Sequence, residues 1–507
     1  MLTEVTGIAT TTQARRAERR ADRESRGYVR LLLGVVLATV FVAGCTATSG
    51  TGGPTAAIFG GDLERPASAS ERIDSEEHSR IVAAYGGIYR DAKVEEALVP
   101  IVSRIVAASD RPDQPYRITI LNAPAVNAFA LPGGYLYVTR GLLALANDSS
   151  EVAAVLAHEM AHVTANHAIQ RQNKVRDAQI VSQAVSDVDP DSGQLALASS
   201  QRTLASFSQQ QELEADALGV KTIGKAGYDP FAAARFLRTM AAYSDYRASL
   251  AMRDRRPDFL SSHPTTPQRV DFAERAARQF GAPGVGAVDR ERYLAGIDGM
   301  VFGDDPSQGF VRERAFFHPK LGIGFTVPDG FVIDNTSDAV LATGIDGTAL
   351  RFDAVGLAQG TDLAEYLRSG WVNGLNETSV QSFSVNGLQA ASAEAEAKGW
   401  FFHIAVIQAG GAATYRFIFA NEARNEAFSQ AAQQTVDSFR TLSEREIAAL
   451  TSLRIRLVEA GPGDGEASLV RQMGGVDRPR ELFRALNGLS ANGRIEPGTT
   501  FKVVTGG

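Results

Sequence analysis

The alternation of apolar and polar positions predicts a helix-rich region first and a β-rich region after it. Apolar residues recur at helical spacing within about 76–108, at Val94, Leu98, Ile101 and Ile105. Pro100 lies inside this run, so we expect the helix to kink or split there. Three strand-like runs follow at 116–121, 127–131 and 135–138, and Pro132-Gly133-Gly134 supplies the turn before the last of them.

The clearest helix start of the chain lies at Asp148. This residue is expected to supply an N-cap oxygen, and Glu151 stands at the third helical position. The apolar periodicity that follows predicts a helix over about 149–170. Further helices are expected at about 205–227 and 230–248, and a loop over 258–267 precedes the next helix.

The second half of the chain changes to β-rich runs. After a linker over 299–315, residues 316–440 read as a small α/β sandwich, whose role the sequence does not indicate. The tail at 453–507 resembles a LysM-like module in Ser468-Leu469, Leu486-Asn487-Gly488-Leu489 and Pro497-Gly498. The predicted fold class is therefore α+β: a mainly helical domain with a small β-sheet at 76–298, then the sandwich, then the LysM-like module.

The N-terminal segment has the pattern of a targeting signal. Seven arginines between Arg15 and Arg30 precede an apolar run of thirteen residues, 31–43, which is shorter than the ~20 residues that span a bilayer. The run ends in Val42-Ala43-Gly44-Cys45, which resembles a bacterial lipobox. The resemblance implies that residues 1–44 are a lipoprotein signal peptide and that Cys45 is acylated. Residues 45–75, rich in Thr, Ser, Gly and Pro, then form a flexible tether.

The composition excludes some binding partners and covalent cross-links. The net charge of −7 and the lack of a basic stripe with interleaved aromatics argue against nucleic-acid binding. The single cysteine, Cys45, excludes an intrachain disulfide. A lipid-anchored protein of the periplasm is therefore expected. Thr46 follows the cysteine, and by resemblance to enterobacterial sorting this favours the outer membrane.

The motif that carries chemistry is His158-Glu159-Met160-Ala161-His162, inside the strong helix. Histidines at i and i+4 lie on one helical face, where they can share one metal ion. Glu159 stands beside them, where its carboxylate can reach a metal-bound water. Two solvated histidines are the alternative, but the apolar flanks predict a buried helix, and buried polar groups need partners. The motif therefore predicts a zinc site with Glu159 as general base.

A third protein ligand is expected, because catalytic zinc usually keeps three protein ligands and a water. Glu212 and Asp216 are four residues apart and share a helical face, whereas Glu214 should point away from it. From these residues alone, Glu212 is the candidate ligand, and a solvated acidic helix face remains the alternative.

The two motifs together resemble the HtpX/BepA/CAAX-endopeptidase family of gluzincin zinc metallopeptidases, and the chain looks closest to the soluble periplasmic BepA-type branch. Further matches over about 80–280 are Asn127-Ala128-Phe129-Ala130, Pro132-Gly133-Gly134, His167, His263-Pro264 and Arg269. The resemblance implies one zinc per chain, held by His158, His162 and Glu212. No TPR-like repeats follow, so the chain departs from BepA there.

The remaining histidines and the aspartate are given supporting roles. Asp216 is expected to fix the tautomer of a ligand histidine. On a continuous helix, His167 is turned about 140° away from His162, so a structural role or support of a ligand is expected for it rather than metal binding. Pro264 places His263 in a loop. Resemblance to the BepA-type branch implies that His263 is a displaceable fourth ligand, a latch; capping a helix or facing solvent is the alternative.

The predicted function is a lipid-anchored periplasmic zinc metalloendopeptidase that hydrolyses unfolded or misassembled envelope proteins in quality control. The substrates are implied by the resemblance alone. The alternative is a chaperone-like or peptidoglycan-binding envelope lipoprotein with a mostly latent protease site, which the LysM-like tail favours. The intact base and ligand set argues for the enzyme.

Overall fold

The computed structural model describes residues 69–171, 173, 208–250, 259–336, 339–358, 360–409, 413–490 and 492–506. The predicted signal peptide, the lipobox with Cys45 and most of the tether lie outside the described residues. Within the described ranges, no helix is both long enough and apolar enough to cross a membrane.

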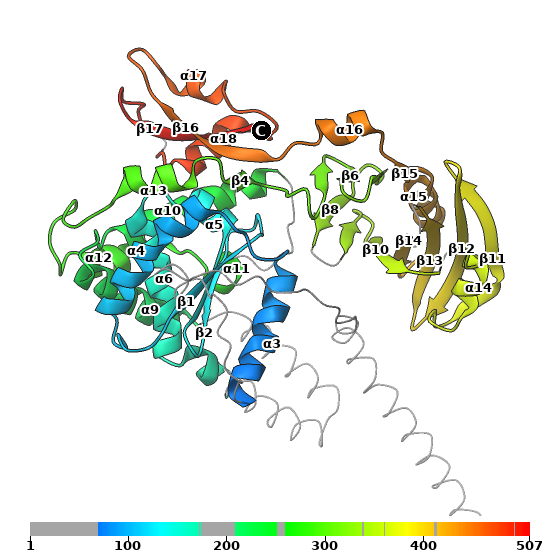
Figure 1. Cartoon of the computed structure of the whole chain (residues 1–507), viewed down its shortest axis with the longest axis horizontal. Helices are drawn as coiled ribbons and strands as arrows, with labels where there is room; N and C mark the ends of the chain where they lie inside the picture. The colour runs from blue at the N-terminus through cyan, green and yellow to red at the C-terminus, as the bar shows by residue number, and fades with distance from the viewer. Residues whose placement is uncertain are drawn as a thin grey trace, which may run out of the picture. The chain divides into compact units, whose positions relative to one another are not determined.

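The helical region surrounds one small sheet (Figure 1). Its strands are β1 (Arg117–Leu121), β2 (Ala128–Leu131) and β3 (Tyr135–Thr139), in the order β1-β3-β2, with β1 parallel and β2 antiparallel to β3. Its described helices are α3 (Ala69–Ala84), α4 (Ala92–Ala108), α5 (Arg140–Leu145), α6 (Ser149–Thr164), α9 (Gln209–Lys225), α10 (Ala232–Ser249), α11 (Phe259–Ser262), α12 (Pro267–Ala277) and α13 (Arg290–Ile297).

Helix α6 is the centre of this region. Every residue of α6 from Ser149 to His162 is buried, because α4, α9, α10 and strand β2 all pack against it. The predicted start is confirmed, since the Asp148 side chain accepts a hydrogen bond from the Glu151 backbone N–H. Gly219 lets α9 approach closely: a Cβ there would lie 3.2 Å from the backbone nitrogen of His158.

The predicted helix over 149–170 is wrong in one respect. Helix α6 ends at Thr164, and Asn166 has a φ of 57°, the left-handed conformation that Asn tolerates better than most residues. A second helical segment then covers 167–171. The predicted split at Pro100 is also wrong, because α4 runs through Pro100 without a break.

The β-rich region forms two sheets. A seven-stranded sheet has the order β11-β12-β13-β14-β10-β9-β8, and a four-stranded sheet has the order β15-β7-β6-β5. The bounds are β5 (Phe310–Arg312), β6 (Ala315–His318), β7 (Ile323–Thr326), β8 (Val332–Asn335), β9 (Val340–Thr343), β10 (Ala349–Gly356), β11 (Leu375–Val385), β12 (Leu388–Ala397), β13 (Trp400–Gln408), β14 (Ala413–Asn421) and β15 (Arg440–Thr441). Helices α14 (Leu363–Arg368) and α15 (Glu426–Asp437) pack on separate apolar clusters of this region.

The tail has a β-α-α-β order. Strands β16 (Leu453–Glu459) and β17 (Thr500–Gly506) pair antiparallel, with α17 (Glu466–Val470) and α18 (Pro479–Leu486) between them and β4 (Val301–Phe302) as a third strand. A short helix, α16 (Glu444–Ala449), precedes it. The apolar side chains of the tail join the same core as the helical region, including Ile455, Leu469, Leu482, Phe483, Phe501 and Val503.

One buried lysine ties the tail to the helical region. Lys502 on β17 is fully buried, and its Nζ donates to the carbonyls of Ala144, Leu145 and Ala146 at distances of 2.8, 3.0 and 2.7 Å. These carbonyls form the end of α5, so the lysine side chain caps that helix just before the turn into α6.

Candidate active site

Four side chains from three segments converge at the middle of the helical region. His158 and His162 lie one turn apart on α6, Glu212 lies in the first turn of α9, and His263 follows α11. All four are buried, and one ligand atom from each lies within 4.8 Å of the others. The structure therefore brings together every residue that the sequence proposed as a metal ligand or latch.

The distances between these donors suit a metal ion. His158 Nε2 and His162 Nε2 are 3.0 Å apart, and His162 Nε2 is 3.4 Å from Glu212 Oε1. His263 Nδ1 is 2.9 Å from the same carboxylate oxygen and 3.4 Å from His158 Nε2. Imidazole nitrogens and one carboxylate oxygen are the donor set of catalytic zinc. A cation among them would also relieve the close approach of the ring nitrogens, so the residues fit zinc.

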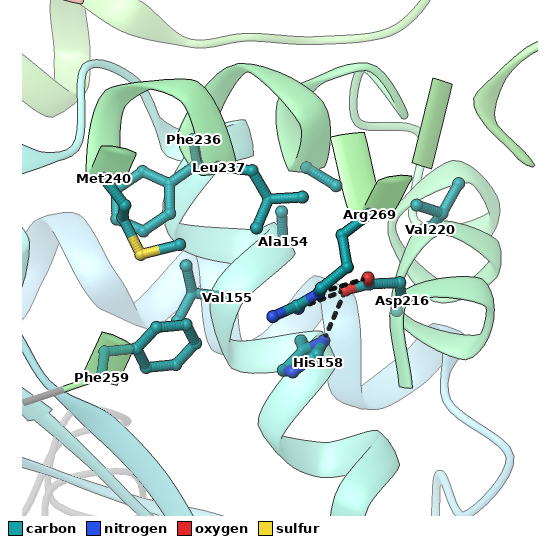
Figure 2. Close-up of a pocket in the computed structure, with 12 residues that line it drawn as sticks. Ala154, Val155, His158, Asp216, Val220, Phe236, Leu237, Met240, Phe259 and Arg269 are labelled. Carbon is teal, nitrogen blue, oxygen red and sulfur yellow. Dashed lines mark hydrogen bonds and ion pairs between the residues drawn. The ribbon is translucent and has the colours of Figure 1, made fainter. Parts of the chain in front are cut away.

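A carboxylate and a guanidinium lie directly behind His158. Asp216 Oδ1 is 3.0 Å from His158 Nδ1, and Arg269 donates to both oxygens of Asp216 at 2.8 and 2.7 Å (Figure 2). Arg269 Nη1 also lies 2.6 Å from Glu212 Oε2. Asp216 therefore lies where it can fix the ring of His158. Arg269 contacts both Asp216 and Glu212.

Glu159 lies beside the four donors without being one of them. Its side chain is 3% exposed, and His263 Nε2 is 3.6 Å from its Oε1. Within the described part of the chain, no hydrogen-bond partner is found for this buried oxygen. Burial raises the pKa of Glu159. An unsatisfied carboxylate oxygen is costly to bury, so this atom is suited to receive a proton or a polar ligand.

The neighbouring charges shift the pKa values of the cluster in different directions. Burial lowers the pKa of His158, but hydrogen bonds to Asp216 and Glu212 more than offset this and raise it to about 9. Burial and the charge on His158 lower the pKa of His162. Burial raises the pKa of Glu212, yet its hydrogen bonds with His158 and His263 leave it lowered overall. The metal-free cluster therefore carries a proton on His158 and a negative charge on Glu212.

His167 lies against His162, a supporting position of the kind that the sequence favoured for it over metal binding, although the contact itself was not expected from a continuous helix. Their Nδ1 atoms are 2.9 Å apart, and His167 Nε2 lies 3.3 Å from Glu214 Oε2. The assumption of a continuous helix turned His167 away, whereas the break at Asn166 returns it to the site. The only signal in the sequence was Asn166 itself, a residue that tolerates the left-handed conformation.

A glutamate between two histidines on one buried helix, with a carboxylate from a second helix beside them, is the arrangement typical of a zinc metallopeptidase site. Comparison with known proteins gives the family. Residues 92–277 match Peptidase family M48, so this part of the chain is similar to the domain of that family.

Curated relatives are similar over part of the chain. The chain is 30% identical over 203 residues to the beta-barrel assembly-enhancing protease of Escherichia coli (strain K12), covering 38% of this chain and 40% of that protein. It is 29% identical over 235 residues to the protein of that name in Yersinia pestis, covering 43% and 47%. The mitochondrial metalloendopeptidase OMA1 of Schizosaccharomyces pombe is 34% identical over 173 residues, covering 34% and 49%. The chain thus spans less than half the length of each relative.

Proposed function

We propose that this chain is a zinc-dependent metalloendopeptidase that hydrolyses peptide bonds of unfolded or misassembled envelope proteins. The observation that carries the proposal is the position of Glu159. Its buried Oε1 lacks a hydrogen-bond partner among the described residues, and the side chain lies next to four converging metal donors. A merely structural glutamate on such a helix would be paired.

His158, His162 and Glu212 would hold one zinc ion, which supplies a Lewis acid for the scissile carbonyl and makes a water acidic near neutral pH. Glu159 then accepts the proton of the attacking water and passes it to the leaving amine. Its raised pKa suits the first step, because a carboxylate with a raised pKa is a stronger base.

Asp216 fixes the ring of His158 in this scheme. The carboxylate accepts from Nδ1, which leaves Nε2 with its lone pair directed at the other donors. Arg269 keeps Asp216 ionised, since its two hydrogen bonds outweigh the effect of burial and lower the pKa of Asp216. Asp216 and Arg269 are therefore positioning residues, and neither touches the reacting atoms.

His263 is proposed as a displaceable fourth ligand that keeps the protease latent. Its side chain is 3% exposed and its Nδ1 contacts Glu212, so the solvent-facing alternative does not describe it. An imidazole in that position would occupy the space that a water or a substrate carbonyl needs. Removal of His263 from the donor set by an arriving substrate would then complete the active site.

A small apolar cavity of about 30 Å³ borders His158 (Figure 2). Its apolar walls include Val155, Phe236, Leu237, Met240 and Phe259. Asp216 and Arg269 line it as well, so the cavity lies on the side of His158 that faces its supporting residues.

The envelope location is part of the proposal. Residues 1–44 would be the signal peptide, Cys45 the lipid anchor, 45–75 the tether, and 76–298 the peptidase domain. The bacterial relatives are named for enhancing β-barrel assembly, and the lipobox resemblance supports the same compartment for this chain. Labelled palmitate should be incorporated into the wild-type chain but not into Cys45→Ser, and incorporation that survives this change rules the anchor out.

The substrate class is tested with paired proteins. Casein, which is unfolded, should be cleaved by the zinc-loaded chain, whereas a compact folded protein of similar size should stay intact. A chelator should stop the cleavage, and zinc should restore it. Cleavage that continues in the presence of the chelator would contradict a zinc-dependent reaction. Equal cleavage of the folded protein would contradict the quality-control role.

Peptidoglycan binding by the tail is a second candidate function. It is favoured by the β-α-α-β order and by two adjacent exposed loops, 461–465 and 492–499. These loops are joined where the Ala460 N–H donates to the Thr499 carbonyl at 3.0 Å. Because the tail shares its core with the peptidase region, the full chain should be tested. The wild-type chain should sediment with sacculi, and the Gly463→Trp variant should not. Recovery of both proteins in the soluble fraction would contradict a LysM-like module.

A further inference from the structure

We propose that His167 and Glu214 form a hydrogen-bonded chain behind His162 that fixes the ring of this metal ligand and strengthens zinc binding. The inference rests on the proposed function, because it takes His162 as a zinc ligand. It adds two positioning residues to a site whose other ligand histidine is held by Asp216.

The break between α6 and the next helical segment creates the contact. Helix α6 ends at Thr164, Asn166 adopts a left-handed φ of 57°, and beyond this break His167 lies against His162. The His162 and His167 rings have their centroids 4.9 Å apart, with an angle of 72° between their planes. His167 is 0% exposed, so its ring is held in place by packing on every side.

The positions of the nitrogens determine how the protons must lie. His162 faces the other donors with Nε2, which is 3.0 Å from His158 Nε2. A histidine that binds zinc through Nε2 carries its proton on Nδ1. That N–H points at His167 Nδ1, 2.9 Å away, which must therefore accept. His167 then carries its own proton on Nε2, where it donates to Glu214 Oε2 at 3.3 Å.

The two ligand histidines are thus supported in different ways. His158 is held directly by Asp216, a buried carboxylate that Arg269 neutralises. His162 is held by a neutral imidazole, and the carboxylate at the far end of the chain is 55% exposed. We expect most of the effect to come from His167, because solvent screens Glu214.

Zinc affinity and the ligand field of a substituted metal report this role without any measurement of cleavage. His167→Phe keeps a ring of similar size and removes both nitrogens. The zinc Kd, measured by competition with a chromophoric chelator, should rise about 10–100-fold, the usual effect of losing a supporting partner of a metal ligand. The visible absorption bands of the cobalt-substituted protein should shift as well.

A conservative change and a remote control separate positioning from simple packing. In His167→Gln the amide can accept and donate, so it should recover part of the lost affinity. Glu214→Gln should weaken binding by only a few-fold. The matched change His403→Phe, in the β-rich region, should leave the zinc Kd and the cobalt spectrum unchanged.

Two outcomes would overturn the proposal: a wild-type Kd and cobalt spectrum in His167→Phe, or equal losses in His167→Phe and His167→Gln with Glu214→Gln unaffected. The metal-free variants should melt within a few degrees of the wild type. If His167→Phe does not fold, His167→Gln and Glu214→Gln alone decide, and wild-type affinity in both overturns it. Failure of the proposed function looks different, because His162→Ala would then keep full zinc affinity.

Discussion

His263 Nδ1 lies 2.9 Å from Glu212 Oε1, although 51 positions separate the two residues in the chain. The contact brings a loop histidine into the donor set beside His158 and His162. If His263 is a latch, His263→Ala should keep its zinc and cleave unfolded substrates several-fold faster, with self-cleavage. Casein turnover at measured zinc content checks this. Lower activity at full zinc occupancy would assign His263 to substrate binding instead.

Zinc binding should release a proton from His158. Hydrogen bonds to Asp216 and Glu212 outweigh burial and raise the pKa of His158 to about 9 in the metal-free protein, so at pH 7.5 zinc must displace that proton. The zinc affinity should therefore rise about tenfold per pH unit up to pH ~9. Calorimetry in buffers of different ionisation enthalpy counts the protons, and Asp216→Asn should release fewer. Proton-free binding in the wild type would contradict the account.

Glu151 should make the stability of the fold depend on pH. Burial and the charge of Asp148 raise the pKa of Glu151 to about 7. A raised folded pKa stabilises the fold fully below the unfolded value, and that contribution is lost as the pH rises to about 7. Glu151→Gln does not titrate, so wild type should lose on the order of 2 kcal/mol relative to it between pH 4.5 and 8. Parallel melting-temperature curves for the two proteins would contradict this.

The tail should be needed for the stability of the peptidase region. Lys502→Met removes the Nζ donor from three buried carbonyls at the end of α5, of which that of Leu145 keeps a second donor in Asn147, and this should cost about 3 kcal/mol or more. Chemical denaturation of the metal-free chain measures the loss. Lys93→Met, at an exposed position on α4, is the matched control and should change little. Equal stability of both variants would show that the contacts of Lys502 do not stabilise the peptidase region.

Local chemistry explains what the sequence predicted well. The capping residues at Asp148 set the start of α6, and the glycines of Pro132-Gly133-Gly134 adopt positive φ in the predicted turn between β2 and β3. The i, i+4 spacing of His158 and His162 alone places both on one face of the helix. These features depend only on residues that are close together in the chain, so they can be predicted from a single sequence.

Features that depend on distant parts of the chain were not predictable. The break at Asn166 was missed because Asn tolerates the left-handed conformation but does not require it. The parallel pairing of β1 with β3 and the shared core of the tail join residues far apart in sequence. Hydrophobic periodicity identifies faces that are buried but does not say against what they are buried.

The central claim is that Glu159 is the general base and is not a metal ligand. Glu159→Gln keeps the shape and polarity of the side chain and removes its capacity to take a proton. Zinc content and casein turnover should be measured on the same preparation, next to Glu212→Gln as the ligand control. The account predicts one zinc per chain in Glu159→Gln with turnover lowered at least 100-fold, and reduced zinc in Glu212→Gln. Wild-type turnover in Glu159→Gln, or loss of its zinc, would contradict it.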